Sequence, residues 1–203
     1  MVTMSDIEHA LASPTGERAA ATPAHLTAAV VADATRERLL DVRYAVVDAP
    51  PGPLVVAATD AGVVRVSFDP PDVAADELAR RISPRIMEAP TLLDDVRREL
   101  DEYFDGRRTT FDVALDWRLV TGPFSRRVLT RTAAIPYGAT STYADIARDA
   151  GNAAASRATG NALGSNPLCI LVPCHRVLRS GGGLGGYAGG LPAKRILLDL
   201  ESA

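Results

Sequence analysis

The sequence predicts an α+β protein in which a strand-rich part is followed by a helical part. Short runs rich in β-branched residues, separated by turn sequences, fill residues 44–68, which is typical of a β-meander. Beyond residue 123 the apolar spacing becomes helical. With 203 residues and 47% apolar content, the chain fits a soluble globular fold of one large domain or two small ones.

Residues 1–42 are predicted to be an N-terminal extension. They are rich in Ala, Thr and Glu, and Ser13-Pro14-Thr15-Gly16 interrupts them. A helix is expected over residues 23–40, with the rest partly disordered. We assign this extension no chemistry.

Residues 43–120 are predicted to form the first domain. Its strands are expected at residues 44–47, 54–58, 63–68 and 111–115. Its helices are expected at residues 74–82 and 91–104. This part contains no cluster of catalytic residue types, so its predicted role is that of a scaffold.

Residues 121–203 are predicted to form the second domain. Its helices are expected at residues 124–135, 142–149 and 153–163. Ser141 or Thr142 can cap the second of these helices, and Ala150-Gly151-Asn152 makes the turn to the third. Two short helices joined by a glycine-containing turn predict a helix-turn-helix.

The last of these helices carries small side chains and one large cation. Residues such as Ala153 and Ala158 let a helix approach a DNA groove, while Arg157 can enter the duplex or pair with a phosphate. The alternative is a small-residue helix packed tightly in a core.

The charge is distributed unevenly along the chain, whose net charge is −3. Residues 1–117 carry 12 Arg against 21 Asp and Glu, a balance of −9, and residues 118–203 carry 10 Lys and Arg against 4 Asp and Glu, a balance of +6. The second part therefore has the sign that favours a phosphate backbone. The alternative is an uneven surface charge without a polyanionic partner.

Composition argues against metal and membrane classes. The two cysteines, Cys169 and Cys174, lie five apart in what is predicted to be one strand and its end, so an internal disulfide is geometrically doubtful. Three histidines with two cysteines argue against a zinc cluster. No apolar segment approaches the roughly 20 residues that span a bilayer, and no signal peptide is recognised, so a cytoplasmic location without membrane contact is expected.

The segment Pro173-Cys174-His175-Arg176-Val177 combines a thiol with an imidazole at the end of an apolar run, ahead of a glycine-rich loop. A cysteine with its ordinary pKa of about 8.5 needs a base to become a nucleophile, and His175 is the histidine at hand. Asp199 or Glu201 can orient that base. Because neighbours in an extended segment point to opposite sides, a bridging water or a bend after Pro173 is required.

Three further residues admit two interpretations each. Tyr143 can donate a proton to a leaving atom or pack as an amphipathic core residue. Asn166 can organise the turn before Pro167 or simply end a helix. Lys194 is the one lysine among 22 basic residues, so an ammonium is either required there or placed by chance.

Together, the motif at residues 173–177, the glycine-rich loop, and Tyr143, Arg157, Asn166, Lys194 and Glu201 at these intervals resemble the O6-alkylguanine-DNA alkyltransferases, the methylated-DNA–protein-cysteine methyltransferases. The resemblance runs from about residue 123 to residue 201, and more loosely from about residue 43. It implies an N-terminal ribonuclease-H-like domain of sheet and helices, followed by a C-terminal winged helix-turn-helix domain.

The resemblance also implies an activity. The expected reaction is a single transfer of an alkyl group from O6-alkylguanine, and from O4-alkylthymine, in double-stranded DNA to Cys174. Members of the family bind mainly the minor groove and rotate the damaged base out of the stack. The thioether product has no easy leaving group, so the protein is consumed. No cofactor or metal is implied, and a monomer is expected.

The resemblance assigns roles to particular residues. Cys174 attacks, His175 takes the thiol proton through a water and is oriented by Glu201, and Tyr143 assists protonation of the departing base. Asn166 and Lys194 shape the loop around the cysteine, and Arg157 holds the space that the base leaves. Further substrate or DNA contacts are implied for Ala153, Ala158, Val177, Tyr187, Ala188 and Gly189.

The sequence departs from the family pattern in places. Ala188 stands where some members have Ser, which removes a hydroxyl near the base. Members fused to a zinc-binding regulatory domain need further cysteines, so a transcriptional role is disfavoured. Two other functions remain open: a lesion-binding module without transfer, against which Cys174 argues, and a Cys-His-Glu hydrolase, which leaves the basic helix-turn-helix unexplained.

Overall fold

The first domain is built around a four-stranded sheet with the order β3-β2-β1-β4. Strands β1 (Val42–Val47), β2 (Leu54–Thr59) and β3 (Gly62–Ser67) are antiparallel neighbours, which confirms the predicted meander. The short β4 (Ile86–Glu88) adds to β1 in parallel. The structure is a computed structural model that describes residues 31, 33, 34, 36, 37 and 39–202, so the helix expected over 23–40 lies largely outside the described residues.

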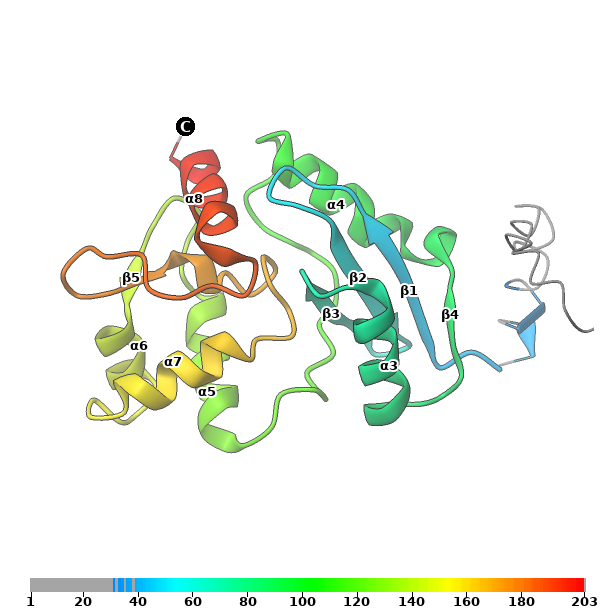
Figure 1. Cartoon of the computed structure of the whole chain (residues 1–203), viewed down its shortest axis with the longest axis horizontal. Coiled ribbons are helices and arrows are strands. Elements are labelled where there is room, and N and C mark those ends of the chain that lie inside the picture. The colour runs from blue at the N-terminus through cyan, green and yellow to red at the C-terminus, as the bar shows by residue number, and fades with distance from the viewer. Residues whose placement is uncertain (1–30, 32, 35, 38, 203) are drawn as a thin grey trace, which may run out of the picture.

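Two helices cover opposite faces of this sheet (Figure 1). Successive side chains of a strand point to opposite faces, and α3 (Pro71–Arg81) packs Leu78 with Val64 in one apolar cluster. The 3-10 helix η1 (Pro90–Leu93) leads into α4 (Asp94–Phe104), whose Leu100 joins Val56 in the other cluster. Both helices begin with proline or acidic residues, which suit a helix N-terminus.

The prediction of a strand at residues 111–115 is wrong. This segment touches the outer edge of β3 at a single bridge, where Val63 N donates to Ala114 O and Asp116 N donates to Val63 O, each at 2.8 Å. It pairs no further because the next part of the β3 edge is occupied: Val66 bonds the backbone of Pro167 and Cys169 at 2.8 and 2.9 Å. The edge of the first domain therefore holds the segment that leads to Cys174.

The second half is a small helical unit with a two-stranded parallel sheet. Its elements are α5 (Pro123–Ala133), β5 (Ser141–Thr142), α6 (Tyr143–Asp149), α7 (Ser156–Gly164), η2 (Cys174–Arg176), β6 (Val177–Leu178) and α8 (Gly190–Glu201). Thr142 caps α6 by accepting a hydrogen bond from Asp145 N at 3.1 Å, as predicted. The pair α6 and α7 forms the helix-turn-helix, and the predicted α+β fold is confirmed.

Two local predictions need correction. The helix expected from residue 153 begins at Ser156, because Ala155 N turns back onto Asn152 O and residues 153–155 belong to that turn. The apolar run before Cys174 is not a strand: Ile170 has φ 73°, and Val172 N bonds Leu168 O at 2.8 Å. A short apolar run does not by itself distinguish a strand from a buried turn.

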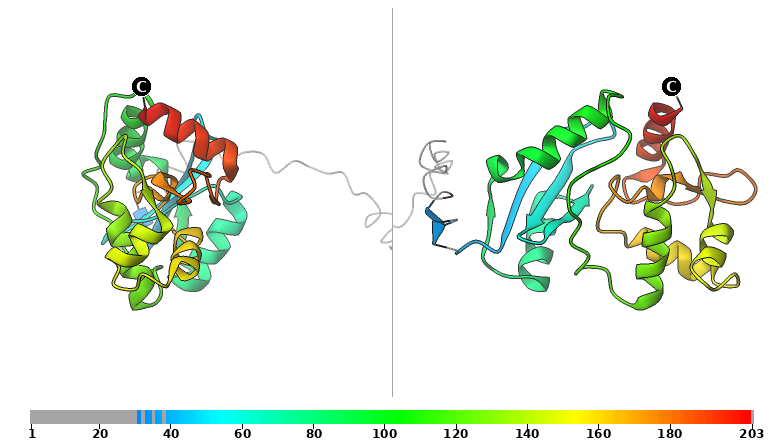
Figure 2. Two further views of the ribbon diagram at one scale, coloured as in Figure 1. Left: turned by 90° about the vertical axis from the view of Figure 1, so that its left-hand side faces the viewer. Right: turned by 180° about the vertical axis from the view of Figure 1, so that it is seen from behind.

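The two halves lie side by side, and Figure 2 shows the same arrangement from behind. The larger apolar cluster draws on both of them, with Val66 and Leu100 from the first and Leu129, Leu168 and Leu197 from the second. This shared core fixes the relation between the sheet and the helical unit. In the part of the chain that the structure describes, no helix is long and apolar enough to cross a membrane.

Candidate active site

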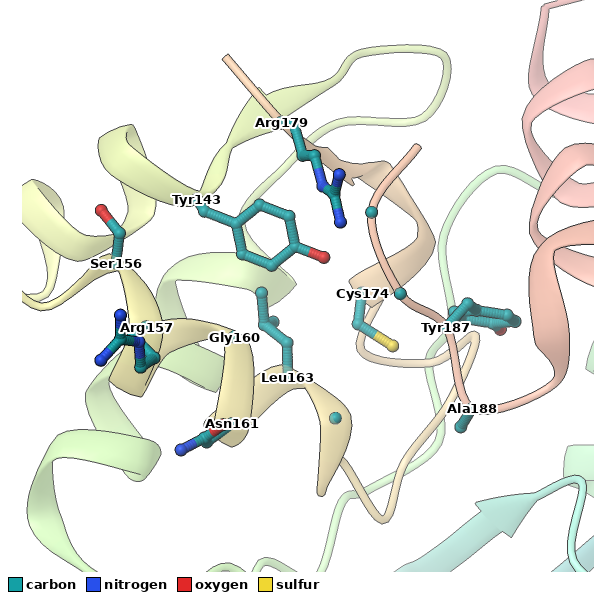
Figure 3. Close-up of a pocket in the computed structure, with 13 residues that line it drawn as sticks. Tyr143, Ser156, Arg157, Gly160, Asn161, Leu163, Cys174, Arg179, Tyr187 and Ala188 are labelled. Atoms are coloured by element: carbon teal, nitrogen blue, oxygen red, sulfur yellow. The ribbon is translucent and has the colours of Figure 1, made fainter. Parts of the chain in front are cut away.

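Cys174 lines a cavity of about 610 Å³ that lies between α6, α7 and the glycine-rich loop. It is the first residue of η2, so the 3-10 turn supplies the bend after Pro173 that the sequence required. Figure 3 shows its sulfur on the cavity wall, with Tyr143 on one side and Tyr187 and Ala188 on the other. The volume is in the range of small-molecule sites, and one nucleobase fits it.

Asn166 fixes the turn on which Cys174 stands. Its Nδ2 donates to Val172 O at 2.9 Å and to the Cys174 sulfur at 3.2 Å, and its Oδ1 accepts from Leu168 N at 3.0 Å. These three contacts join both ends of the segment 166–174. Asn166 therefore both shapes the backbone and places a donor on the sulfur.

The surroundings of Cys174 favour its thiolate. A hydrogen bond from the Cys169 thiol, the contact from Asn166 and the positive charge of Lys194 together outweigh burial and lower the pKa of Cys174 below its ordinary value. The pKa of Cys169 is raised well above its ordinary value by that same hydrogen bond and by burial, so Cys169 stays a thiol and donates. Cys174 is the more nucleophilic of the two sulfurs.

His175 is buried and neutral. Burial lowers its pKa despite the nearby carboxylate of Glu201. Its Nε2 lies 2.8 Å from Glu201 Oε1, and because an ionised carboxylate only accepts, this nitrogen carries the hydrogen. Nδ1 is then the basic nitrogen, and no group of the described residues hydrogen-bonds to it.

Glu201 accepts hydrogen bonds from three different side chains. His175 Nε2 and the Tyr103 hydroxyl reach its Oε1 at 2.8 and 2.6 Å, and Arg176 contacts both carboxylate oxygens at 2.8 Å. Burial raises the pKa of Glu201, but the hydrogen bonds from His175 and Arg176 outweigh burial and lower it to about 2. Of the two carboxylates that the sequence left open, Glu201 is the one that contacts His175.

The sequence did not predict a role in the site for Tyr103 or Arg176. Tyr103 lies on α4 in the first domain and is fully buried, so its pKa is raised by burial and by Glu201 and the phenol stays protonated. A tyrosine far from the motif carries no sequence signal for this contact. Arg176 stands inside the motif but is buried, and it also donates to Ile135 O at 2.5 Å.

Lys194 has no exposed surface and holds the loop that covers the cavity. Its ammonium donates to Val177 O at 2.7 Å, to Leu184 O and to Gly186 O at 3.5 Å. Burial lowers its pKa to about 8. Three carbonyls around one ammonium explain why this position is a lysine, because a planar guanidinium suits a different geometry.

The first domain also contacts the loop directly. Phe68, just after β3, packs edge-on against Tyr187 with ring centres 5.6 Å apart. A Cβ on Gly189 would lie 2.8 Å from the Phe68 ring, so this position accepts only glycine without a shift. Gly185 is constrained in the same way by the Tyr143 hydroxyl, at 2.5 Å from an added Cβ.

The residues predicted from the sequence fall into three groups. Those on the cavity wall are Cys174, Tyr143, Arg157, Tyr187 and Ala188. Those behind the wall, in the network just described, are His175, Glu201, Asn166 and Lys194. Those that do not line the cavity are Ala153 and Ala158, which are exposed, Val177, which is buried in β6, and Gly189, which packs on Phe68.

The cavity wall contains other polar residues that sequence reasoning did not select. Ser156 and Asn161 lie on α7 on either side of Arg157, and Arg179 enters from the loop after β6 (Figure 3). Helical spacing from Arg157 gives a signal for Asn161, which lies four residues on. Arg179 follows the cysteine motif by two residues and had no such signal.

Comparison with known proteins identifies this architecture. Residues 42–117 match the family model described as 6-O-methylguanine DNA methyltransferase, ribonuclease-like domain, and residues 123–203 match the one described as 6-O-methylguanine DNA methyltransferase, DNA binding domain. The Methylated-DNA–protein-cysteine methyltransferase of Methanosarcina acetivorans is 37% identical over 79% of this chain and 98% of its own length. The inducible enzyme of that name from Bacillus subtilis is 40% identical over 72% of this chain and 82% of its own.

Solved structures agree. The Mycobacterium tuberculosis O6-methylguanine methyltransferase superposes with a TM-score of 0.69 at 36% identity, covering 79% of this chain and 93% of that one. The Mycobacterium tuberculosis OGT in complex with DNA gives a TM-score of 0.68 at 36% identity, covering 79% and 92%. The two domains and the buried cysteine site thus define a DNA-binding methyltransferase of the repair class. The chain belongs to the 6-O-methylguanine DNA methyltransferase family, and the resemblance seen in the sequence is confirmed.

Replacing Tyr103 with Phe tests the contact between the first domain and Glu201. The change removes one hydrogen bond to a buried carboxylate, and we expect it to lower the free energy of unfolding by about 1.5 to 3 kcal/mol. Tyr137→Phe is the matched control, since its hydroxyl bonds the neutral Leu200 O at 3.1 Å and its loss costs about 1 kcal/mol. Urea denaturation of both variants measures the difference, and equal losses contradict the expectation.

The lowered pKa of Glu201 predicts how the free energy of unfolding depends on pH. Its pKa is about 2 in the folded chain against an ordinary 4.5, so the stabilisation is complete above pH 4.5 and is lost as the pH falls toward 2. Allowing for screening, about 1 to 2 kcal/mol is lost between pH 5 and pH 3. Urea denaturation at these pH values should show a shallower dependence for Glu201→Gln than for the native chain. The prediction is wrong if the free energy of unfolding changes equally with pH in the two proteins.

Proposed function

We propose that this chain repairs duplex DNA by transferring the alkyl group of O6-alkylguanine, and of O4-alkylthymine, to Cys174 in a single event. The observation that carries the proposal is the placement of the Cys174 sulfur on the wall of a cavity large enough for a nucleobase, with His175 next to it in the chain and held by Glu201. The relatives named above are methylated-DNA–protein-cysteine methyltransferases.

Proton transfer prepares the nucleophile. We assign His175 Nδ1 as the acceptor of the Cys174 thiol proton through a bridging water, since Nε2 already donates to Glu201. Glu201 stays ionised throughout and stabilises the imidazolium that forms. The low pKa of Cys174 reduces the work that this base has to do.

The transfer itself is an in-line displacement. The sulfur forms a bond to the alkyl carbon while the bond from that carbon to the base oxygen breaks, and the electron pair leaves on the base. Tyr143, whose hydroxyl faces the cavity, assists protonation of the departing base (Figure 3). The resulting thioether has no easy leaving group, so the chain does not turn over.

DNA is held by the helix-turn-helix. Ala158 and Arg157 on α7 are exposed, as is Ala153 in the turn before it, so small side chains and one cation face outward here. The balance of +6 over residues 118–203 suits a phosphate backbone. Arg157 lies at the mouth of the cavity and holds the space of the base that rotates out.

The loop over the cavity sets which base and alkyl group fit. Tyr187 and Ala188 line the cavity, and Gly189 and Lys194 hold the loop in place. Ala188 adds only a methyl group to this wall. Val177 acts through its carbonyl, which accepts the hydrogen bond from Lys194.

The wider assignment follows from the same features. We place the domain division at residues 43–120 and 121–203, after an extension at 1–42. We also propose that the chain acts as a monomer. The cysteines among the described residues are free, which suits the reducing cytoplasm.

Mass spectrometry tests the acceptor. Incubation with duplex DNA containing O6-methylguanine should add one methyl group per chain, found on the tryptic peptide 158–176. Because this peptide contains both cysteines, the matched variants are Cys174→Ala, which should gain no methyl group, and Cys169→Ala, which should gain one. A methyl group on Cys169, or repeated release of demethylated DNA, contradicts the proposal.

Arg157→Ala tests the extrusion of the base. We expect transfer from duplex DNA to slow by about 5- to 150-fold, because a lost DNA contact of this kind costs about 1 to 3 kcal/mol. Transfer from the free base O6-benzylguanine should be unchanged, since no duplex is opened. Arg195→Ala, an equal loss of charge at an exposed position that does not line the cavity, is the control. Equal slowing on both substrates contradicts the role.

A further inference from the structure

The sulfur atoms of Cys169 and Cys174 both contact Asn166. The Cys174 sulfur lies 3.2 Å from Asn166 Nδ2, and the Cys169 sulfur lies 3.6 Å from Asn166 O. Both backbones are also tied to Val172: Cys174 N donates to Val172 O at 2.8 Å, and Cys169 forms a bridge with Val172. The segment between the two cysteines therefore folds back on itself.

Both cysteines are free, as expected, but the extended path assumed between them is wrong. Five residues of extended strand would separate the two cysteines by about 16 Å, which excludes a disulfide. The left-handed Ile170 and the turn that follows it break the extended path, so that both sulfurs contact Asn166. The Cys169 thiol also lowers the pKa of Cys174, as expected for two thiols that lie close together.

The two sulfurs differ in access. Cys174 lines the cavity, whereas Cys169 lies behind it, 1% exposed, and does not reach the cavity wall. A small oxidant that enters the cavity therefore meets Cys174 first. Cys169 is placed to react with whatever forms there.

We propose that Cys169 and Cys174 form a peroxide-sensitive dithiol in which Cys169 captures an oxidised Cys174 as an intramolecular disulfide. The inference concerns the sulfur that the proposed function makes the alkyl acceptor, but it does not require alkyl transfer. Its consequence is protection, since a nucleophile that is used once is wasted if it is oxidised irreversibly.

The chemistry balances with hydrogen peroxide as the oxidant. The Cys174 thiolate attacks one peroxide oxygen, the O–O bond breaks, and hydroxide leaves, which gives a sulfenic acid. The Cys169 thiol then gives up its proton and attacks the Cys174 sulfur, the S–O bond breaks, and water leaves. Two thiols lose two electrons in total, and one peroxide becomes two waters.

Peptide mapping tests the proposal. The reduced native chain is treated with hydrogen peroxide, free thiols are then blocked with iodoacetamide, and the peptide 158–176 is weighed. We expect it to be two hydrogens lighter than the reduced peptide and to carry no block. In Cys169→Ala the same treatment should add two or three oxygens to Cys174. The proposal is overturned if Cys174 of the native chain gains two or three oxygens as fast as Cys174 of the variant. It is also overturned if the disulfide forms between two chains.

Recovery of activity gives a second readout. Each protein is treated with peroxide and then with dithiothreitol, and its methyl transfer is compared with that of its untreated sample. The native chain should recover the untreated level, whereas Cys169→Ala should not. Cys169→Ser repeats the comparison if the alanine variant folds poorly, and native peptide mapping decides alone if neither folds. A reduced chain that transfers no methyl group but forms the disulfide rejects only the proposed function.

Discussion

A buried carboxylate is the constraint on which the rest of this structure depends. Glu201 is 5% exposed, and an ionised carboxylate away from water is costly unless several donors surround it. Three side chains on two elements supply the donors: His175 and Arg176 on η2, and Tyr103 on α4. Satisfying one charge therefore fixes the end of α8, the turn that carries Cys174 and a helix of the other domain.

The first domain consequently does more than carry the second. Its β3 edge bonds Pro167 and Cys169, and Phe68 supports the loop at Tyr187 and Gly189. Together with the hydrogen bond from Tyr103 to Glu201, these contacts hold three parts of the site around Cys174. The scaffold role expected from the sequence is incomplete, because the ribonuclease-like domain sets the geometry of a site whose reactive groups all lie in the other domain.

The site separates two electrostatic tasks. Around His175 the charges are arranged to keep Glu201 ionised and the imidazole neutral, which preserves a base. Around Cys174 the donors Cys169 and Asn166 and the charge of Lys194 favour a thiolate. A low pKa supplies the nucleophile, and a neutral base collects its proton.

The sequence by itself determined the class of fold and most of the site. The motif at residues 173–177 identified Cys174 and His175, and periodicity placed the helix-turn-helix, because helical spacing and turn residues are local properties. It left Asp199 and Glu201 as alternatives, and its predictions of strands at residues 111–115 and in the apolar run before Cys174 were wrong. Only the tertiary structure decided these points. Contacts between distant parts of the chain decide which carboxylate bonds His175 and which segment pairs with the β3 edge. They also decide that Tyr103 and Cys169 lie near the site. Such contacts leave no periodic pattern in the sequence.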